Sequence, residues 1–295
     1  MFPSFLPQDV NLLEHPDSIA LAKKIGRIGI PTSLSSREIA TAYVQSGEGN
    51  PPLLLLHGFD SSLLEYRHIF PLLANKQETW AVDLLGFGFT NRPNNLSYNP
   101  QTIKEHLYCF WREMINRPVV VVASSMGGAT AIDLAITYPE VVSKLVLMNP
   151  VGYSGSFYLG KLLFKPIDWL AVEFLRQRRV QALFWGKAFK AIDPKIEDVL
   201  RCATLPSQMP NWERAIADFT RSGGYYNLAN KIHLVTQPSL ILWGDHDEML
   251  GTAAALEFER AIADSKLVWL PGVGHTPHWE QPKVVAEKII DFINR

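Results

Sequence analysis

The amino-acid sequence predicts an α/β fold, in which a mostly parallel, twisted sheet is flanked by helices and carries a helical insertion. Three observations lead to this prediction. Short apolar runs alternate with helix-compatible segments along most of the 295 residues. The run 141–148 is almost wholly apolar, as is typical of a strand buried on both faces. Between about residues 151 and 222 the alternation stops and helical segments take over.

The elements are expected in the following order. Residues 1–36 form an N-terminal arm, in which 17–30 has helical spacing of its apolar residues and either docks on the domain or touches a membrane. Strands are expected at 37–49, 53–57, 79–83, 118–122, 145–148, 238–243 and 266–270, and helices at 61–75, 101–116, 129–138, 253–263 and 279–294. The catalytic core therefore comprises 37–150 and 223–295, joined by right-handed crossovers.

Composition narrows the class of protein. A hydrophobic content of 47 % with 19 % charged residues is ordinary for a globular chain, and a formal net charge of −1 argues against nucleic acid as a partner. No apolar run reaches the ~20 residues of a membrane-spanning helix, and no secretion signal is evident, so we expect a cytoplasmic protein. The two cysteines have no metal-like spacing, and no metal, nicotinamide or flavin motif is present. We therefore expect no cofactor.

The most informative feature lies around Ser125. Ala-Ser-Ser-Met-Gly-Gly at 123–128 follows the apolar run 118–122 and precedes a helix-compatible stretch, which is typical of a nucleophile elbow. Such a turn needs small neighbours, and Gly127, two residues after Ser125, provides one. Ala123 stands where glycine is usual. The N-terminus of the following helix would point free N–H groups at the serine, where negative charge would develop.

A serine needs a base to activate it, and the base needs a carboxylate to orient it. The run 238–243 ends in Gly-Asp-His-Asp at 244–247, and the run 266–270 ends in Pro-Gly-Val-Gly-His at 271–275. Acid and histidine thus each follow a strand, in the chain order serine, acid, histidine.

With these motifs the chain resembles the α/β-hydrolase fold superfamily from about residue 37 to the C-terminus. The resemblance implies a triad of Ser125, His275 and Asp247, with Asp247 chosen over Asp245 because it stands three residues after the glycine of the acid loop. His-Gly-Phe at 57–59 looks like the family's oxyanion loop, so the backbone N–H groups of Phe59 and Met126 would hold the oxyanion.

Rival residues have structural interpretations. Ser124 is expected to lie against the oxyanion loop or the core, and His57 to form structural hydrogen bonds. His278 is expected on the first turn of the last helix, as a surface residue or as a neighbour of the site. Asp83 is expected to be structural, although some relatives draw catalytic acids from other strands.

By the same resemblance, 151–222 is a cap that covers the site. Its many aromatic residues predict an apolar pocket, with Trp169, Phe184, Trp185 and Trp212 as candidate substrate-binding residues, although some must form the core of the cap. The cap also holds more basic than acidic residues. Such charge usually marks a solvated helix face. The alternative is peripheral contact with an anionic membrane, through the cap or through the N-terminal arm.

The sequence thus predicts a serine esterase, similar to lipases, that cleaves an apolar ester through an acyl-enzyme. Serine at the elbow argues against the dehalogenase and epoxide-hydrolase branches, which use aspartate there. The alternatives are a hydrolase of carbon–carbon bonds in ring-cleavage dienes, a dephytylase-like hydrolase of isoprenoid esters, and a ligand-binding member without catalysis. Fold alone does not decide among them.

Overall fold

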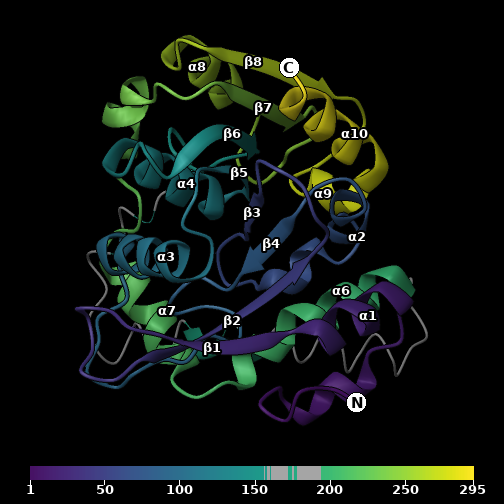
Figure 1. Ribbon diagram of the computed structural model, residues 1–295, viewed down its shortest axis with the longest axis vertical. Helices are drawn as coiled ribbons and strands as arrows, with labels where there is room; N and C mark the ends of the chain where they lie inside the picture. The colour runs from purple at the N-terminus through teal and green to yellow at the C-terminus, as the bar shows by residue number, and fades with distance from the viewer. Residues whose placement is uncertain (156, 158–159, 161–171, 175, 178–193) are drawn as a thin grey trace.

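The computed structural model describes residues 1–155, 157, 160, 172–174, 176–177 and 194–295. Within them an eight-stranded sheet forms the centre of the molecule, with the strand order β1-β2-β4-β3-β5-β6-β7-β8 (Figure 1). The strands are β1 Gly26–Ile30, β2 Ile39–Ser46, β3 Leu53–Leu56, β4 Thr79–Val82, β5 Val119–Ser124, β6 Val142–Met148, β7 Ser239–Gly244 and β8 Ser265–Leu270. Strands β3 to β8 pair in parallel, whereas β2 is antiparallel to both β1 and β4. The predicted mostly parallel sheet is confirmed.

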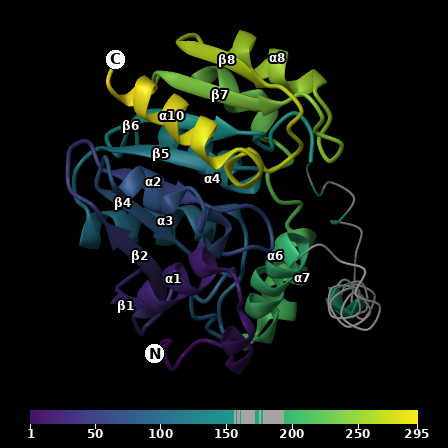
Figure 2. The ribbon, with the colours of Figure 1, turned by 90° about the vertical axis from the view of Figure 1, so that its right-hand side faces the viewer.

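Helices cover both faces of this sheet (Figures 1 and 2). The α-helices are α1 Pro16–Lys24, α2 Phe70–Ala74, α3 Pro100–Met114, α4 Met126–Thr137, α6 Pro194–Thr204, α7 Trp212–Arg221, α8 Ala253–Ala261, α9 Pro277–Glu280 and α10 Pro282–Ile293. The 3-10 helices are η1 Gln8–Leu12, η2 Leu63–Tyr66, η4 Leu205–Gln208 and η5 Leu228–Leu234.

Alternate side chains of the inner strands divide the core into two halves. Leu54 and Leu56 of β3 face the half that also contains α3, α4 and α8, whereas Leu53 and Leu55 face the half that contains α1, α2 and α10. Because successive residues of a strand point to opposite faces, a strand covered on both sides must be apolar throughout. This explains why β3 reads Leu-Leu-Leu-Leu and why all four residues are fully buried.

One prediction about the N-terminal arm is wrong. The expected helix at 17–30 ends at Lys24, and Gly26–Ile30 forms β1, which pairs with β2. Glycine at position 26 disfavours a continued helix, and the β-branched Ile28 and Ile30 suit a strand. Helical and alternating spacing cannot be told apart over so short a segment. The sheet therefore starts inside the predicted arm.

The N-terminal arm docks on the domain, which is one of the two roles predicted for it. Leu6, Val10 and Leu13 are each at most 7 % exposed and join the core half beneath α1 and α10. Among the described helices, none combines the length and apolar character needed to cross a membrane.

Two predicted helices are each divided in two. The segment 61–75 forms η2 and α2, and the segment 279–294 forms α9 and α10. In the second case Gln281 leaves the helical region, with φ −133° and ψ 59°, because the following Pro282 restricts the residue before it. Part of the predicted cap, residues 156, 158–159, 161–171, 175 and 178–193, lies outside the described residues. Its described elements α6, η4 and α7 are helical.

The strand order also places the functional region. From β3 the chain moves to β4 on one side of β3 and then to β5 on the other, so the order reverses there. In open α/β sheets, ligands bind beyond the carboxyl ends of the strands at such a point. The loop after β3 and the turn at Ser125 after β5 meet at this position.

Candidate active site

Ser125 occupies a strained turn between β5 and α4. Its backbone has φ 51° and ψ −120°, a conformation that residues other than glycine rarely adopt. Ser125 N donates to Met148 O at 3.0 Å, and Ser125 O accepts from Val151 N at 3.0 Å, so β6 and its loop hold the turn. A Cβ at Gly127 would lie 2.1 Å from Leu56 O, and therefore only glycine lets α4 pack this closely on β3.

The side chains of Ser125, His275 and Asp247 form one hydrogen-bonded chain. Ser125 Oγ lies 3.0 Å from His275 Nε2, and His275 Nδ1 lies 2.9 Å from Asp247 Oδ2. These distances place the proton of Nδ1 toward the carboxylate and leave Nε2 to accept from the serine, an assignment made from the partners. The three residues predicted from separate motifs thus lie together in the order that nucleophilic catalysis requires.

Asp247 is held ionised by its neighbours. Oδ2 also accepts from Asn149 Nδ2 at 2.6 Å, and Oδ1 accepts from the backbone N–H groups of Met249 and Leu250 at 2.8 and 3.0 Å. Burial alone would raise the pKa of this carboxyl, but the bonds from His275, Leu250 and Asn149 outweigh it and lower the pKa to about 2. Asp247 therefore stays a carboxylate that can stabilise a protonated His275.

The predicted oxyanion donors lie beside the serine. Met126 is the first residue of α4. The first backbone N–H groups that donate within this turn are those of Gly128 and Ala129, which both donate to Ser125 O, so the Met126 N–H has no partner within the helix. Phe59 and Met126 line one cavity with Ser125. The loop carrying Phe59 approaches closely, since a Cβ at Gly58 would lie 3.4 Å from Ser125 Cβ.

A mostly buried carboxylate supports this loop. Gly58 N donates to Glu65 Oε2 at 3.1 Å, and Glu65 Oε1 lies 3.1 Å from His278 Nε2. The second contact is within ion-pairing distance but lacks the alignment of a hydrogen bond. Burial would raise the pKa of the Glu65 carboxyl, but its contact with His278 outweighs burial and lowers the pKa to about 2.

Of the two roles expected for His278, the structure agrees with that of a neighbour of the site. It is fully buried on α9, and its ring packs on Tyr66 with centroids 5.1 Å apart. Sequence reasoning missed its pairing with Glu65, because the two residues are far apart in the chain and belong to no shared motif. The one available signal was a histidine three residues after His275.

The other rival residues have structural contacts. His57 Nε2 accepts from Leu84 N at 3.1 Å, and its Nδ1 lies 2.8 Å from Gly58 O. Asp83 accepts from Leu63 N and Phe89 N, both at 2.6 Å, and burial raises the pKa of its carboxyl. Ser124 ends β5 and is 1 % exposed.

An apolar cavity of about 220 Å³ opens above Ser125. Its described lining comprises Phe59, Ser125, Met126, Val151, Gly155, Phe157, Phe219, Tyr225, Met249 and Leu250. The hydroxyl of Tyr225 is bonded to Thr130 Oγ1 at 2.9 Å, and burial raises its pKa well above the ordinary value. The serine hydroxyl is therefore the one reactive side-chain group of this described lining.

The predicted substrate-binding residues are placed only in part. Trp169, Phe184 and Trp185 lie outside the described residues. Trp212 is 1 % exposed, and its Nε1 donates to Asp60 Oδ1 at 2.8 Å, which ties α7 to the loop after β3. Trp212 is not part of the described lining, in which Phe157 and Phe219 supply the aromatic rings from the predicted cap.

The site combines a strained turn at the serine with an acid and a histidine in the loops after later strands of a mostly parallel sheet. This combination is typical of hydrolases with an α/β fold. Residues 51–282 match the family described as alpha/beta hydrolase fold. The chain belongs to this family and is a hydrolase of it.

Similar proteins have more than one named activity. The chain is 34 % identical to the alpha/beta hydrolase domain-containing protein VTE7 of Arabidopsis thaliana, over 99 % of this chain and 90 % of the relative. It is 28 % identical to a 2-hydroxy-6-oxo-6-(2'-aminophenyl)hexa-2,4-dienoic acid hydrolase of Metapseudomonas resinovorans, over 87 % and 88 %. The solved structure of a thermophilic esterase from Thermogutta terrifontis superposes with a TM-score of 0.74 at 22 % identity, over 91 % and 98 %. The last likeness shows the fold alone.

The charge of Glu65 makes a testable contribution to stability. Because its pKa falls from 4.5 to about 2 on folding, the ionised form contributes on the order of 3 kcal/mol above pH 4.5, and this is lost as the pH falls through about 2. We expect Glu65→Gln to unfold at lower urea concentration than wild type at pH 7. The difference in unfolding midpoint between wild type and Glu65→Gln should narrow steadily below about pH 4.5.

Urea unfolding across this pH range measures the effect, with Glu257→Gln on the exposed face of α8 as the matched control. The control should follow wild type at every pH. A gap between Glu65→Gln and wild type that stays constant from pH 7 to pH 3 would contradict a lowered pKa at Glu65.

Proposed function

We propose that the chain is a serine hydrolase that cleaves carboxylic esters of apolar substrates, with Ser125, His275 and Asp247 as its catalytic triad. The observation that carries this proposal is the hydrogen-bonded chain of these side chains at the wall of an apolar cavity. A nucleophile, a base and an orienting carboxylate are in bonding contact, and the nucleophile faces the space where an ester would bind.

In the first step, Ser125 Oγ attacks the ester carbonyl while His275 Nε2 takes the serine proton. Asp247, which stays ionised, stabilises the resulting imidazolium. The backbone N–H groups of Phe59 and Met126 stabilise the oxyanion of the tetrahedral intermediate. The intermediate collapses to an acyl-enzyme and expels the alcohol, which receives the proton from His275.

In the second step, water replaces the alcohol. His275 removes a proton from the water as it attacks the acyl-enzyme, and the same backbone donors stabilise the second oxyanion. Collapse releases the carboxylic acid and returns the proton to Ser125 Oγ. The Glu65 carboxylate serves both steps by fixing the loop on which Phe59 N–H is carried.

The cavity favours a neutral, apolar substrate. None of its described lining residues carries a charge, and the described aromatic rings of Phe59, Phe157 and Phe219 lie in mutual contact with centroids 4.7 to 6.0 Å apart. An ester of an apolar acid gains from burial here, whereas a carboxylate would lose its hydration without finding a cation among the described lining residues.

The second candidate is hydrolysis of a carbon–carbon bond in a ring-cleavage diene. It is favoured by the 28 % identity to a relative with that kind of name, and it would use the same triad. Its substrate is an acid, however, and the uncharged described lining favours the ester. A dephytylase-like isoprenoid esterase is a special case of the first proposal. A ligand-binding member without catalysis would bind an apolar ligand without turnover.

The role of Ser125 as nucleophile can be tested by removing its oxygen. Ser125→Ala should lower hydrolysis of nitrophenyl esters by about 10⁴-fold or more while the fold stays intact, because the attacking oxygen is lost. The adjacent serine is a matched control, since Ser124 ends β5 and is not among the described residues that line the cavity, and Ser124→Ala should keep most of the activity.

Esters with acyl chains of two to sixteen carbons, assayed at equal enzyme concentration, provide the measurement. Equal turnover by wild type and Ser125→Ala would contradict the serine mechanism. A folded wild type that hydrolyses a dienoate of the ring-cleavage type and none of the esters would favour the second candidate. Binding of an apolar ligand with no turnover of either would favour the ligand-binding alternative.

The role of the cavity in substrate choice can be tested at Phe157. Phe157 is partly buried, lines the cavity and packs on Phe59 with ring centroids 4.7 Å apart. Phe157→Ala should enlarge the cavity and shift the preferred acyl chain to greater length. Phe174→Ala, which removes the same side chain from an exposed position (62 % exposed), should leave the preference unchanged. An unchanged preference in Phe157→Ala would place the acyl chain elsewhere.

We also propose peripheral contact with anionic membranes, which was the alternative to a solvated helix face for the basic residues of the cap. Arg178 and Arg179 lie outside the described residues, and Arg176 pairs with Glu173 and Glu213, which reduces its share of the positive charge. Flotation at low salt should show protein on vesicles containing an anionic lipid and none on neutral vesicles. Equal flotation on both kinds of vesicle, or none on either, would remove the electrostatic proposal.

A further inference from the structure

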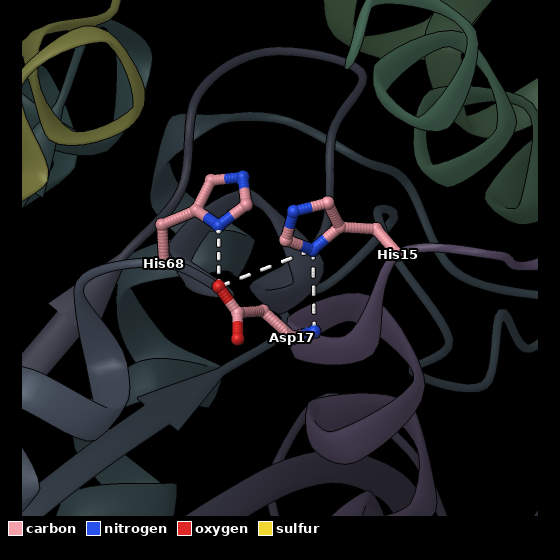
Figure 3. A group of neighbouring side chains, drawn as sticks. All are labelled: His15, Asp17 and His68. Carbon is pink, nitrogen blue, oxygen red and sulfur yellow. Dashed lines mark hydrogen bonds and ion pairs between the residues drawn. The ribbon is translucent and has the colours of Figure 1, made fainter. Parts of the chain in front are cut away.

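A cluster of three metal-ligating side chains lies away from Ser125, where the N-terminal segment meets the core. His15 and Asp17 stand at the start of α1, and His68 lies between η2 and α2 (Figure 3). One ligand atom from each residue lies within 4.8 Å of the other two. The mechanism proposed for Ser125 uses none of these residues.

The distances between the three candidate ligand atoms are near those between the ligands of a bound metal ion. His68 Nδ1 lies 2.9 Å from Asp17 Oδ2, His15 Nδ1 lies 3.9 Å from the same oxygen, and the two rings cross at 82° with centroids 4.8 Å apart. Ligands of tetrahedral zinc are about 3.3 Å apart. Small rotations of side chains that are 21 to 45 % exposed would supply this spacing.

The same cluster borders a cavity of about 430 Å³ with a buried acidic group in its wall. His15, His68 and Asp198 all line this cavity. Asp198 Oδ2 accepts from Ser18 Oγ at 2.7 Å and from Arg67 Nε at 2.9 Å, whereas its other oxygen, Oδ1, is buried without a hydrogen-bond partner among the described residues. A buried carboxylate oxygen without a partner is costly, so this wall of the cavity, which Arg67 also lines, is polar.

We propose that His15, Asp17 and His68 bind a divalent transition metal, with Zn²⁺ as the best match. Two imidazoles and one carboxylate are a ligand set that suits zinc, and a fourth position toward the cavity is left for water. The ion would join the N-terminal segment to the segment that carries Glu65, and so stabilise the fold.

Binding has a defined cost in hydrogen bonds. His15 Nδ1 accepts from Asp17 N at 3.2 Å, and this long bond is lost when the nitrogen coordinates a metal. The proton between His68 Nδ1 and Asp17 must move to His68 Nε2, because a metal ligand is deprotonated at the coordinating nitrogen.

Untagged protein, stripped with a chelator and dialysed, should be titrated with Co²⁺ and then with Zn²⁺. We expect one Co²⁺ per chain, the strong visible absorption of a four-coordinate site, loss of this absorption when Zn²⁺ is added, and a rise of several degrees in the unfolding temperature with Zn²⁺. Asp17→Asn and His68→Ala should each weaken Co²⁺ binding by about tenfold or more.

His233→Ala, which removes an exposed histidine of η5, is the matched control and should bind like wild type. Asp17→Asn keeps the size of an exposed side chain, so it tests the site even where His68→Ala unfolds. The proposal is overturned if wild type binds Co²⁺ no more tightly than Asp17→Asn, or if His233→Ala loses as much affinity as the variants of the site. It is also overturned if Zn²⁺ leaves the unfolding temperature of wild type unchanged.

Discussion

The close approach of α4 to β3 at Gly127 is the constraint on which the candidate active site depends. A side chain at this position would collide with the carbonyl oxygens of Leu56 and His57 at 2.1 and 2.6 Å. Because the helix can come this near, the turn before it is forced into the strained conformation of Ser125. That strain lifts the hydroxyl into the cavity and places Met126 N–H beside it. The energy that holds the turn comes from the buried strands on both sides.

Two largely buried carboxylates then stabilise the two halves of the site. Asp247 orients the histidine that contacts Ser125, and Glu65 holds the loop that carries Phe59. Each is removed from water, which would favour the neutral acid, and each is kept ionised by backbone N–H groups and a histidine partner. In the proposed mechanism the charge is therefore fixed before substrate arrives, so little reorganisation is needed when an oxyanion forms.

The parts of the site that the sequence predicts are those that follow strands. Ser125, Asp247 and His275 stand directly after β5, β7 and β8, and in a parallel sheet the carboxyl ends of such strands must meet along one edge. Motif and topology thus place these residues together without knowledge of side-chain packing. The inner strands of the sheet can also be predicted from the sequence, because strands buried on both faces are mostly apolar.

What the sequence does not predict depends on packing between distant segments. Glu65 and His278 meet because η2 and α9 pack together, and no spacing in the chain reports this. The sequence predicts a helix where β1 forms, since five residues with two glycines have no distinctive period. Trp212 illustrates the same limit, because aromatic content alone cannot separate a ring that lines a cavity from one that fixes a helix to a loop.

This division explains why family membership leaves the substrate open. The reacting atoms are positioned by backbone geometry of the sheet, which any member of the family must keep. The described lining of the cavity instead comes from the loop after β3, the loop after β6, α7 and the acid loop after β7. Side chains on such connections can change without disturbing the sheet. The positions of Ser125, Asp247 and His275 are thus set by the strands, and the choice of substrate by the segments that line the cavity.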